Sequence, residues 1–294
     1  MPTEYVRAKS VEEAISALRS AAGEGIVLAG GLMVGSIINQ KLSVPSVIVD
    51  ISRIQPLRTL ARTRDGGLSI GALVTHEDIL RSAAVRDVAP LLAEIAADVA
   101  CGRLRNRGTI GGSLCMIGQQ GDPATGLIIL GATIRLRGPG GARMLTLEEF
   151  YNDAFSVDLQ EGEILEEVLV PDLPPRSGYA FLKIGPREAM DFTLIAVSVG
   201  VTLTDDETIE IVRIALNGVA PTVIRPMMVE RLLSGKKAAQ LNWREAIDAL
   251  QGEISPQGDL VYSENHKRHL AAVALRRSTE RALARAIAGR SAIQ

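Results

Sequence analysis

The sequence predicts an α+β protein made of three successive units that each combine strands with helices. Short runs rich in Val, Ile and Leu alternate with capped helical segments over roughly the first 170 residues. A proline-dense stretch at 171–178, PDLPPRSG, separates this part from the rest and is typical of a linker. The remainder opens with three strand-like runs and closes with helical segments. These observations divide the chain into units at 1–56, 57–173 and 177–288.

The composition excludes several functional classes. The 294 residues carry a formal net charge of only −2, so no overall field attracts nucleic acid or an anionic membrane. No apolar run reaches the roughly 18 residues of a membrane span, and the N-terminus lacks a secretion signal pattern, so we expect a cytoplasmic protein. Cys101 and Cys115 are too few to ligate an iron–sulfur cluster within this chain.

The first unit, 1–56, begins with a helix. Ser10 and Glu13 have the spacing of a capping box, and the apolar residues that follow recur on one helical face. The run IVLAG at 26–30 is predicted to be a strand that leads into a first glycine pair, and the run at 46–52 is predicted to be a second buried strand.

The second unit, 57–173, repeats this logic. GLSIGALV at 67–74 predicts a strand, and Thr75 with Asp78 starts a helix whose first turn holds His76, interpreted as a solvated residue. An Ala-rich helix is expected over about 88–104, before the second glycine pair. The apolar stretch at 126–138 ends in a predicted strand, and 162–171 forms another, closed by a proline.

The third unit, 177–288, reads as strands at 179–185, 192–204 and 210–221, then helices at about 222–234, 243–251 and 263–288. Asp205 and Asp206 mark a turn, so the last two strands should pair as a hairpin. The basic residues of the last helix indicate a solvated face, or one that touches an acidic partner, since no aromatic residue is available for base stacking. His266 and His269 lack a further metal ligand at useful spacing.

The two glycine pairs, Gly30–Gly31 and Gly111–Gly112, are the candidate site. Glycines beside strands and helix starts leave backbone amides open to phosphate oxygens. Near the second pair Thr109 and Ser113 add hydroxyls, and Arg105 and Arg107 add positive charge. Either pair alone favours a tight turn or close packing, whereas both together predict two loops that hold one dinucleotide. Neither G-x-x-x-x-G-K-[ST] nor G-x-G-x-x-G occurs, which excludes a P-loop and a Rossmann fingerprint.

The order of these segments resembles the flavoprotein (medium) subunit of the molybdenum hydroxylases, typified by bacterial carbon monoxide dehydrogenase and the flavin domain of xanthine dehydrogenase. The blocks that carry the resemblance span almost the whole chain. They are VLAGGLMVGSIINQKLSVPSVIVDIS, RNRGTIGGSLC, GDPATGLIILGATIRL, AMDFTLIAVSVGVTL, IALNGVAPTVIRP and HKRHLAAVALRRSTERAL.

The resemblance implies a two-part FAD-binding domain of the vanillyl-alcohol-oxidase (PCMH) type, followed by a smaller C-terminal domain with a three-stranded antiparallel sheet and helices. FAD would lie between the two parts, with its diphosphate on the glycine loops. Asp122 falls at an acid that binds the adenosine end, Leu165 at an apolar position packed on the flavin, and Lys183 at a basic position near the flavin. The loops themselves correspond to Ala29, Gly30, Gly31, Leu32 and Met33 and to Thr109, Ile110, Gly111, Gly112 and Ser113.

The chain departs from the family pattern at two places. The first loop reads AGGLM where the family often has A-G-G-[QH]-S, so Leu32 and Met33 replace a polar pair. After Ser113 the chain reads LCMIGQ where the family often has L-A-H-A-D-P, so a histidine and an acid near the flavin edge are absent. We expect this second difference to affect proton transfer and the choice of electron acceptor.

By resemblance, the chain is an FAD-containing electron-transfer subunit of a heterotrimeric molybdenum hydroxylase. A small subunit would carry two [2Fe–2S] clusters, a large subunit would carry the molybdenum cofactor, and the complex would be a dimer of heterotrimers that reduces an external acceptor. Two alternatives stay open: a self-contained FAD oxidoreductase of the same fold, and a non-enzymatic nucleotide-binding scaffold with a decayed flavin site. The position of all three histidines outside the predicted loops argues against the first alternative.

Overall fold

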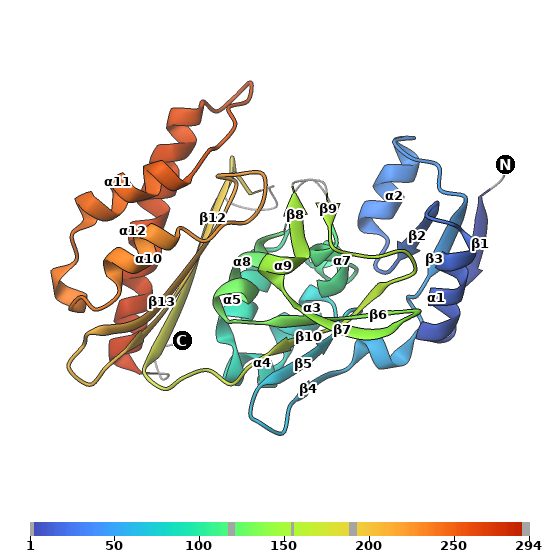
Figure 1. Ribbon diagram of the computed structural model, residues 1–294, viewed down its shortest axis with the longest axis horizontal. Coiled ribbons are helices and arrows are strands. Elements are labelled where there is room, and N and C mark those ends of the chain that lie inside the picture. The colour runs from blue at the N-terminus through green and yellow to red at the C-terminus, as the bar shows by residue number, and fades with distance from the viewer. Residues whose placement is uncertain (1–2, 117–120, 154–155, 188–192, 290–294) are drawn as a thin grey trace.

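The computed structural model describes residues 3–116, 121–153, 156–187 and 193–289. The chain runs from a small N-terminal sheet at one end, through a central sheet with helices, to a helix-covered sheet at the other end (Figure 1). Among the described residues no helix is long and apolar enough to cross a membrane.

The N-terminal sheet is parallel and has the strand order β1-β3-β2. The first helix of this unit begins as predicted, because the Ser10 hydroxyl accepts a hydrogen bond from the Glu13 amide. The Glu13 carboxylate accepts from the Lys9 amide and not from that of Ser10, so the capping box is not reciprocal. The apolar face is buried against the sheet, as predicted. The elements are β1 (Glu4–Arg7), α1 (Val11–Ser20), β2 (Gly25–Leu28), α2 (Leu32–Asn39), β3 (Val47–Asp50) and the 3-10 turn η1 (Gln55–Arg58).

The central sheet has five strands in the order β4-β5-β10-β6-β7, and every pairing is antiparallel. Strand β10 comes last in the chain but lies in the middle, so it closes this sheet before the proline-rich stretch. The strands are β4 (Leu60–Arg62), β5 (Leu68–Gly71), β6 (Thr133–Gly138), β7 (Gly141–Thr146) and β10 (Ile164–Val170), with a separate pair β8 (Tyr151–Asp153) and β9 (Ser156–Val157).

The long helix predicted over 88–104 is wrong. Pro90 starts a new helix because it cannot donate to a preceding turn, and Ala100 has a φ of 41°, which no α-helix accommodates. The segment therefore forms α4 (Ala83–Val88), α5 (Pro90–Asp98) and α6 (Gly102–Arg105). The other helices of this part are α3 (His76–Arg81), α7 (Ile110–Leu114), α8 (Asp122–Ile129) and α9 (Leu147–Phe150).

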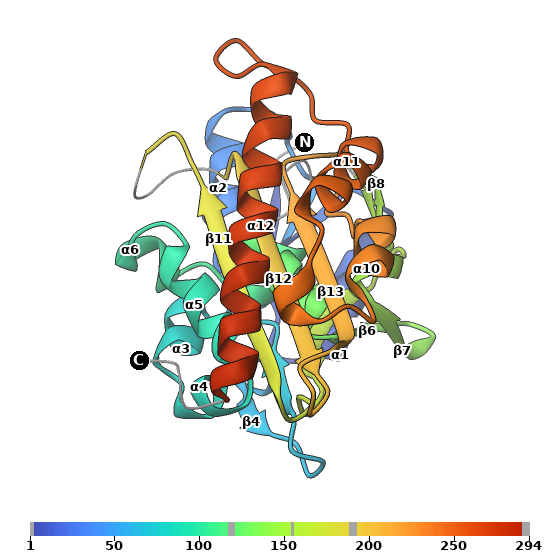
Figure 2. The same cartoon turned by 90° about the vertical axis from the view of Figure 1, so that its left-hand side faces the viewer.

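The C-terminal sheet is antiparallel in the order β11-β12-β13, and its last two strands form the predicted hairpin. Helix α12 lies along one face, and α8 and α5 lie against the other (Figures 1 and 2). Gly178 lets the α12 backbone approach, because a Cβ there would lie 2.0 Å from the Ala282 carbonyl oxygen. The elements are β11 (Ser177–Ile184), β12 (Ile195–Leu203), β13 (Ile209–Asn217), α10 (Met227–Leu233), the 3-10 turn η2 (Ala238–Gln240), α11 (Trp243–Glu253) and α12 (Glu264–Ala288).

The buried apolar residues form three clusters that follow these sheets. The N-terminal cluster also takes in Leu73 and Ile164, and the central cluster takes in Phe181 and Ala215 from the C-terminal sheet. The sheets are therefore packed on one another rather than joined only by linkers. This packing holds the two glycine loops in fixed positions: the first follows β2 of the N-terminal sheet, and the second lies between α6 and α7.

Candidate functional site

The first glycine loop connects β2 to α2. Gly31 has a φ of 79° and is the N-cap residue of α2, with no side chain capping the helix. The left-handed region favours glycine, so the backbone conformation alone is enough to explain why residue 31 is a glycine. Leu32 and Met33 form the first turn of α2, where backbone amides have no partner within the helix. The loop thus presents amides at the positive end of a helix.

The second glycine loop leads into α7. Thr109 is the N-cap residue, and its hydroxyl accepts the Gly112 amide at 3.2 Å. The Ile110 and Gly111 amides donate to the carbonyls of Val74 and Ala72, at 2.9 and 3.0 Å. We predicted that these amides would face a diphosphate; instead they fix the loop to the central sheet.

Gly111 has a packing role as well. A Cβ at this position would lie 2.7 Å from the Ala72 Cβ, so only glycine fits against the segment that follows β5. Gly112 is exposed. A Cβ at this position would approach only the Thr109 hydroxyl oxygen of the same turn. The second glycine pair therefore combines a buried packing residue with an exposed residue that leaves the loop surface open.

Arg107 joins the two loops. Its guanidinium donates to the Gly30 carbonyl oxygen from Nε at 3.1 Å and from Nη2 at 3.0 Å. The backbones also touch, because a Cβ on Gly30 would lie 1.9 Å from the Arg107 carbonyl oxygen. The two loops thus meet at Gly30 and Arg107, and a cation lies beside the start of α2. This open cradle with amides and positive charge fits an anionic diphosphate.

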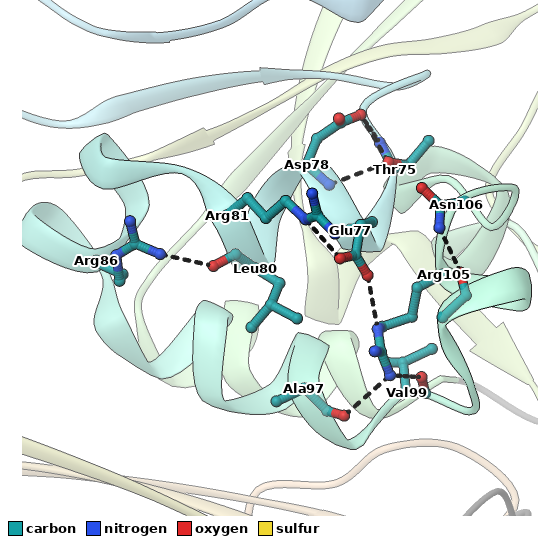
Figure 3. A network of polar contacts seen from close by, with 11 residues as sticks. Thr75, Glu77, Asp78, Leu80, Arg81, Arg86, Ala97, Val99, Arg105 and Asn106 are labelled. Atoms are coloured by element: carbon teal, nitrogen blue, oxygen red, sulfur yellow. Dashed lines mark hydrogen bonds and ion pairs between the residues drawn. The ribbon is translucent and has the colours of Figure 1, made fainter. Parts of the chain in front are cut away.

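Arg105 does not contribute to this charge as predicted. Its Nε donates to Glu77 at 3.0 Å, and its Nη1 is directed toward the carbonyls of Ala97 and Val99 (Figure 3). Glu77 also binds Arg81, and these two arginines lower the pKa of the Glu77 carboxyl. Arg105 therefore ties α6 to α3 and α5, and Arg107 is the arginine that reaches the loops.

His76 lies beneath the second loop. We predicted a solvated residue, but it is only 2% exposed, because its amide donates to the Gly108 carbonyl and its ring packs against Gly108. Nε2 lies 2.7 Å from the Ser113 hydroxyl oxygen. Burial lowers the pKa of His76 to about 4, with Asp122 raising it and Arg105 lowering it to a smaller extent. The imidazole is therefore neutral at pH 7. Its buried position beside the second loop could not be predicted from the sequence, because it depends on the pairing of Thr75 with Thr109.

Asp122 and Lys183 form a buried ion pair. The Lys183 ammonium lies 2.8 Å from Asp122 Oδ2, and the Thr193 hydroxyl donates to Oδ1 at 2.5 Å. The family resemblance implied that Asp122 lies at the adenosine end of FAD and that Lys183 lies near the flavin. An extended dinucleotide has these groups at opposite ends, so a pair in direct contact cannot serve both. The structure brings these residues together across α8 and β11 at a single location.

The remaining predicted site residues differ in their exposure to solvent. Leu165 is 4% exposed on β10 and belongs to the same apolar cluster as Ile110 and Leu114 of the second loop. Leu32 and Met33 are 41% and 42% exposed. The LCMIGQ departure runs into residues 117–120, which lie outside the described residues. Cavities of about 390 and 180 Å³ lie elsewhere, against α12 and behind β11–β13 respectively.

Comparison with known proteins identifies the family. Residues 1–173 match the family described as the FAD binding domain in molybdopterin dehydrogenase, and residues 180–282 match the CO dehydrogenase flavoprotein C-terminal domain. The chain belongs to this flavoprotein family. It is an oxidoreductase subunit with an FAD-binding domain, and the predicted α+β fold class, with a three-stranded antiparallel sheet and helices in the C-terminal domain, is confirmed.

Individual relatives cover almost the whole chain. The carbon monoxide dehydrogenase medium chain of Hydrogenophaga pseudoflava is 32% identical over 96% of this chain and 97% of its own length. The 6-hydroxypseudooxynicotine dehydrogenase complex subunit alpha of Paenarthrobacter nicotinovorans is 31% identical over 97% and 94%. The solved structure of the Hydrogenophaga pseudoflava enzyme has a TM-score of 0.91, at 30% identity over 97% of this chain and 98% of that one.

Proposed function

We propose that this chain is the FAD electron-transfer subunit of a heterotrimeric molybdenum hydroxylase. The observation that carries the proposal is the direct contact of the two glycine loops through Gly30 and Arg107, within a chain that belongs to an FAD-binding family. This contact creates one anion-binding surface from two separate loops. We also propose the boundaries 1–56 and 57–173 for the two parts that share FAD, and 177–288 for the C-terminal domain.

The residues of the loops would hold the diphosphate. The amides of Leu32 and Met33 at the start of α2 and the guanidinium of Arg107 supply positive electrostatic potential. These contacts need no side-chain polarity at positions 32 and 33, so the AGGLM sequence is compatible with the site. When bound, FAD supplies the electron-carrying chemistry, and the protein orients it and excludes competing reactions.

Asp122 and Lys183 would lie at one end of the cofactor rather than at both. Asp122 is 5% exposed and Lys183 is directed into it, so the pair is a preformed polar anchor between α8 and β11. Leu165, Thr109 and Gly112 would contribute packing and loop shape. We assign Ile110 and Gly111 to positioning the loop and not to contact with phosphate through their amides.

The partners follow from the relatives. Two similar proteins are named as a medium chain of carbon monoxide dehydrogenase and as one subunit of a dehydrogenase complex. The solved Hydrogenophaga pseudoflava enzyme is described as lacking the Mo-pyranopterin moiety of its molybdenum cofactor, so the cofactor is named for that enzyme. We therefore propose a large molybdenum-binding subunit, a small subunit with two [2Fe–2S] clusters, a dimer of such heterotrimers, an external electron acceptor and a cytoplasmic location.

A self-contained flavin oxidoreductase would need a base at its own substrate pocket. All three histidines lie outside the predicted loops in the sequence, but the structure brings His76 into contact with Ser113 of the second loop. His76 nevertheless makes a poor substrate base, because it is buried and its Nδ1 is inaccessible to solvent. This alternative predicts turnover of an organic substrate by the isolated chain.

The test is to purify the chain and to isolate its complex from the native host. We expect a yellow protein with stoichiometric FAD, and co-purification of a large molybdenum protein and a small iron–sulfur protein whose reduced clusters reduce the bound FAD. A chain that takes up no FAD on reconstitution would contradict the cofactor assignment. A chain that binds FAD but co-purifies with no such partners would favour the self-contained oxidoreductase. Bound FAD that the assembled partners do not reduce would favour the scaffold.

A further inference from the structure

His76 and Ser113 form a buried pair that the family comparison does not explain. The imidazole is 2% exposed, and its Nε2 lies 2.7 Å from Ser113 Oγ. Ser113 is half-buried on α7, one residue beyond the exposed Gly112. The serine hydroxyl therefore lies between a buried ring and the open surface of the second loop.

The surroundings of the ring decide where its proton lies. Nδ1 is inaccessible to solvent and has no hydrogen-bond partner among the described residues. The imidazole is neutral, since burial opposes its charge and the acid that favours its protonation, Asp122, is already paired with Lys183. A neutral ring has one N–H, and an orphaned buried N–H is rarer in proteins than an unused acceptor. The proton therefore belongs on Nε2.

A proton on Nε2 fixes the direction of the hydrogen bond. His76 Nε2 donates and Ser113 Oγ accepts. The serine proton is then not used by the ring and is free to point toward the loop surface. In the opposite tautomer, the serine proton would point at the ring and Nδ1–H would be buried without an acceptor.

We propose that His76 is a positioning residue that turns the Ser113 hydroxyl into a hydrogen-bond donor toward an anionic oxygen of the FAD diphosphate. The inference rests on the proposed function, because it assumes that FAD occupies the glycine loops. His76 itself does not touch the cofactor. Because His76 donates to Ser113 and does not accept a hydrogen bond from it, the hydroxyl proton of Ser113 remains available for the phosphate.

The tautomer can be measured on the unmodified protein. With ¹⁵N-labelled histidine, two-bond ¹H–¹⁵N correlation spectra distinguish Nε2–H from Nδ1–H. The chain has three histidines, so the His76→Gln variant assigns the signal by its disappearance. We expect the Nε2–H pattern with and without FAD. The Nδ1–H pattern would overturn the inference even if the protein binds FAD.

FAD affinity gives the second readout, by titration of the apoprotein followed through flavin fluorescence. Ser113→Ala and His76→Phe should each weaken binding by about tenfold, and the double variant by no more than either. His76→Gln, whose amide can donate to Ser113, should stay close to the wild type. Additive losses, or an unchanged affinity in Ser113→Ala, would overturn the inference, whereas a wild-type chain that binds no FAD would overturn the proposed function.

The ligand atom can be tested with ADP, which carries a diphosphate but no flavin. If Ser113 donates to the diphosphate, Ser113→Ala should weaken ADP by a factor similar to that for FAD, with thermal unfolding as a check that the variant is folded. An unchanged ADP affinity beside a weakened FAD affinity would contradict the assignment to the diphosphate.

Discussion

Arg107 binds the carbonyl oxygen of Gly30 through two nitrogens, at 3.1 and 3.0 Å, across 77 positions of the chain. This contact joins the loop after β2 to the loop before α7. It satisfies a backbone carbonyl of the first loop and leaves a positive charge beside the start of α2. The Arg107 side chain thus both links the two loops and places a positive charge at the candidate cofactor site.

Replacing Arg107 should weaken FAD binding. We expect Arg107→Ala to raise the FAD dissociation constant by roughly 10- to 100-fold, because hydrogen bonds made by charged groups contribute about 1.5–3 kcal/mol. Arg107→Lys should recover little, since an ammonium cannot reproduce the paired donors. Arg103→Ala, at an exposed position on α6, is the matched control and should bind FAD normally. Equal losses in both arginine-to-alanine variants would point to a general charge effect.

Gly30 should not tolerate a side chain. In Gly30→Ala the new Cβ would overlap the Arg107 carbonyl, so the loops must separate, at a cost of about 1–3 kcal/mol in the free energy of unfolding. Gly35→Ala is the control, because nothing lies within 4 Å of the added atom and the site is inside α2. It should stabilise the protein by about 0.5–1 kcal/mol. Urea denaturation measures both, and a neutral Gly30→Ala would mean that the loops are not in contact.

The ion pair of Asp122 and Lys183 should be strongly coupled. Lys183→Met leaves the buried Asp122 carboxylate without its cation and should lower the free energy of unfolding by about 3–5 kcal/mol. Asp122→Ala should cost less, because the partly buried Lys183 ammonium still donates to the Asp98 carbonyl oxygen. The double variant should lose less than the sum of the two. A double-mutant cycle by chemical denaturation checks this, and strictly additive losses would show that the two side chains act separately.

The buried His76 should make the free energy of unfolding sensitive to acid. Its pKa is about 4 in the folded protein, below the ordinary 6.5, so the unfolded state binds the proton first. The stability it contributes is complete above about pH 6.5 and is lost as the pH falls toward 4. The wild type should therefore lose about 3 kcal/mol more between pH 7 and 4 than His76→Gln. Parallel pH profiles of unfolding for the two proteins would contradict the burial of this imidazole.

Local signals in the sequence predicted many elements correctly. The reciprocal capping box at Thr75 and Asp78 forms, and β12 and β13 pair as a hairpin. The prediction failed where local signals were weak or conflicting. Helix α2 was missed because Gly31 caps it without a side chain, and the helix over 88–104 is interrupted at Pro90 and at Ala100. Such interruptions are enforced by packing as much as by propensity.

The sequence by itself determined many of the strands and helices and the two glycine loops, because these follow from local apolar periodicity, caps and motifs. The family followed from the resemblance of whole sequence blocks. Only the tertiary structure decided that Arg107 and not Arg105 reaches the loops, that Asp122 pairs with Lys183, and that His76 is buried under Ser113. Each of these facts is a contact between residues far apart in the chain. Their energies come from burial and charge in the assembled fold, and neither is set until the sheets pack together.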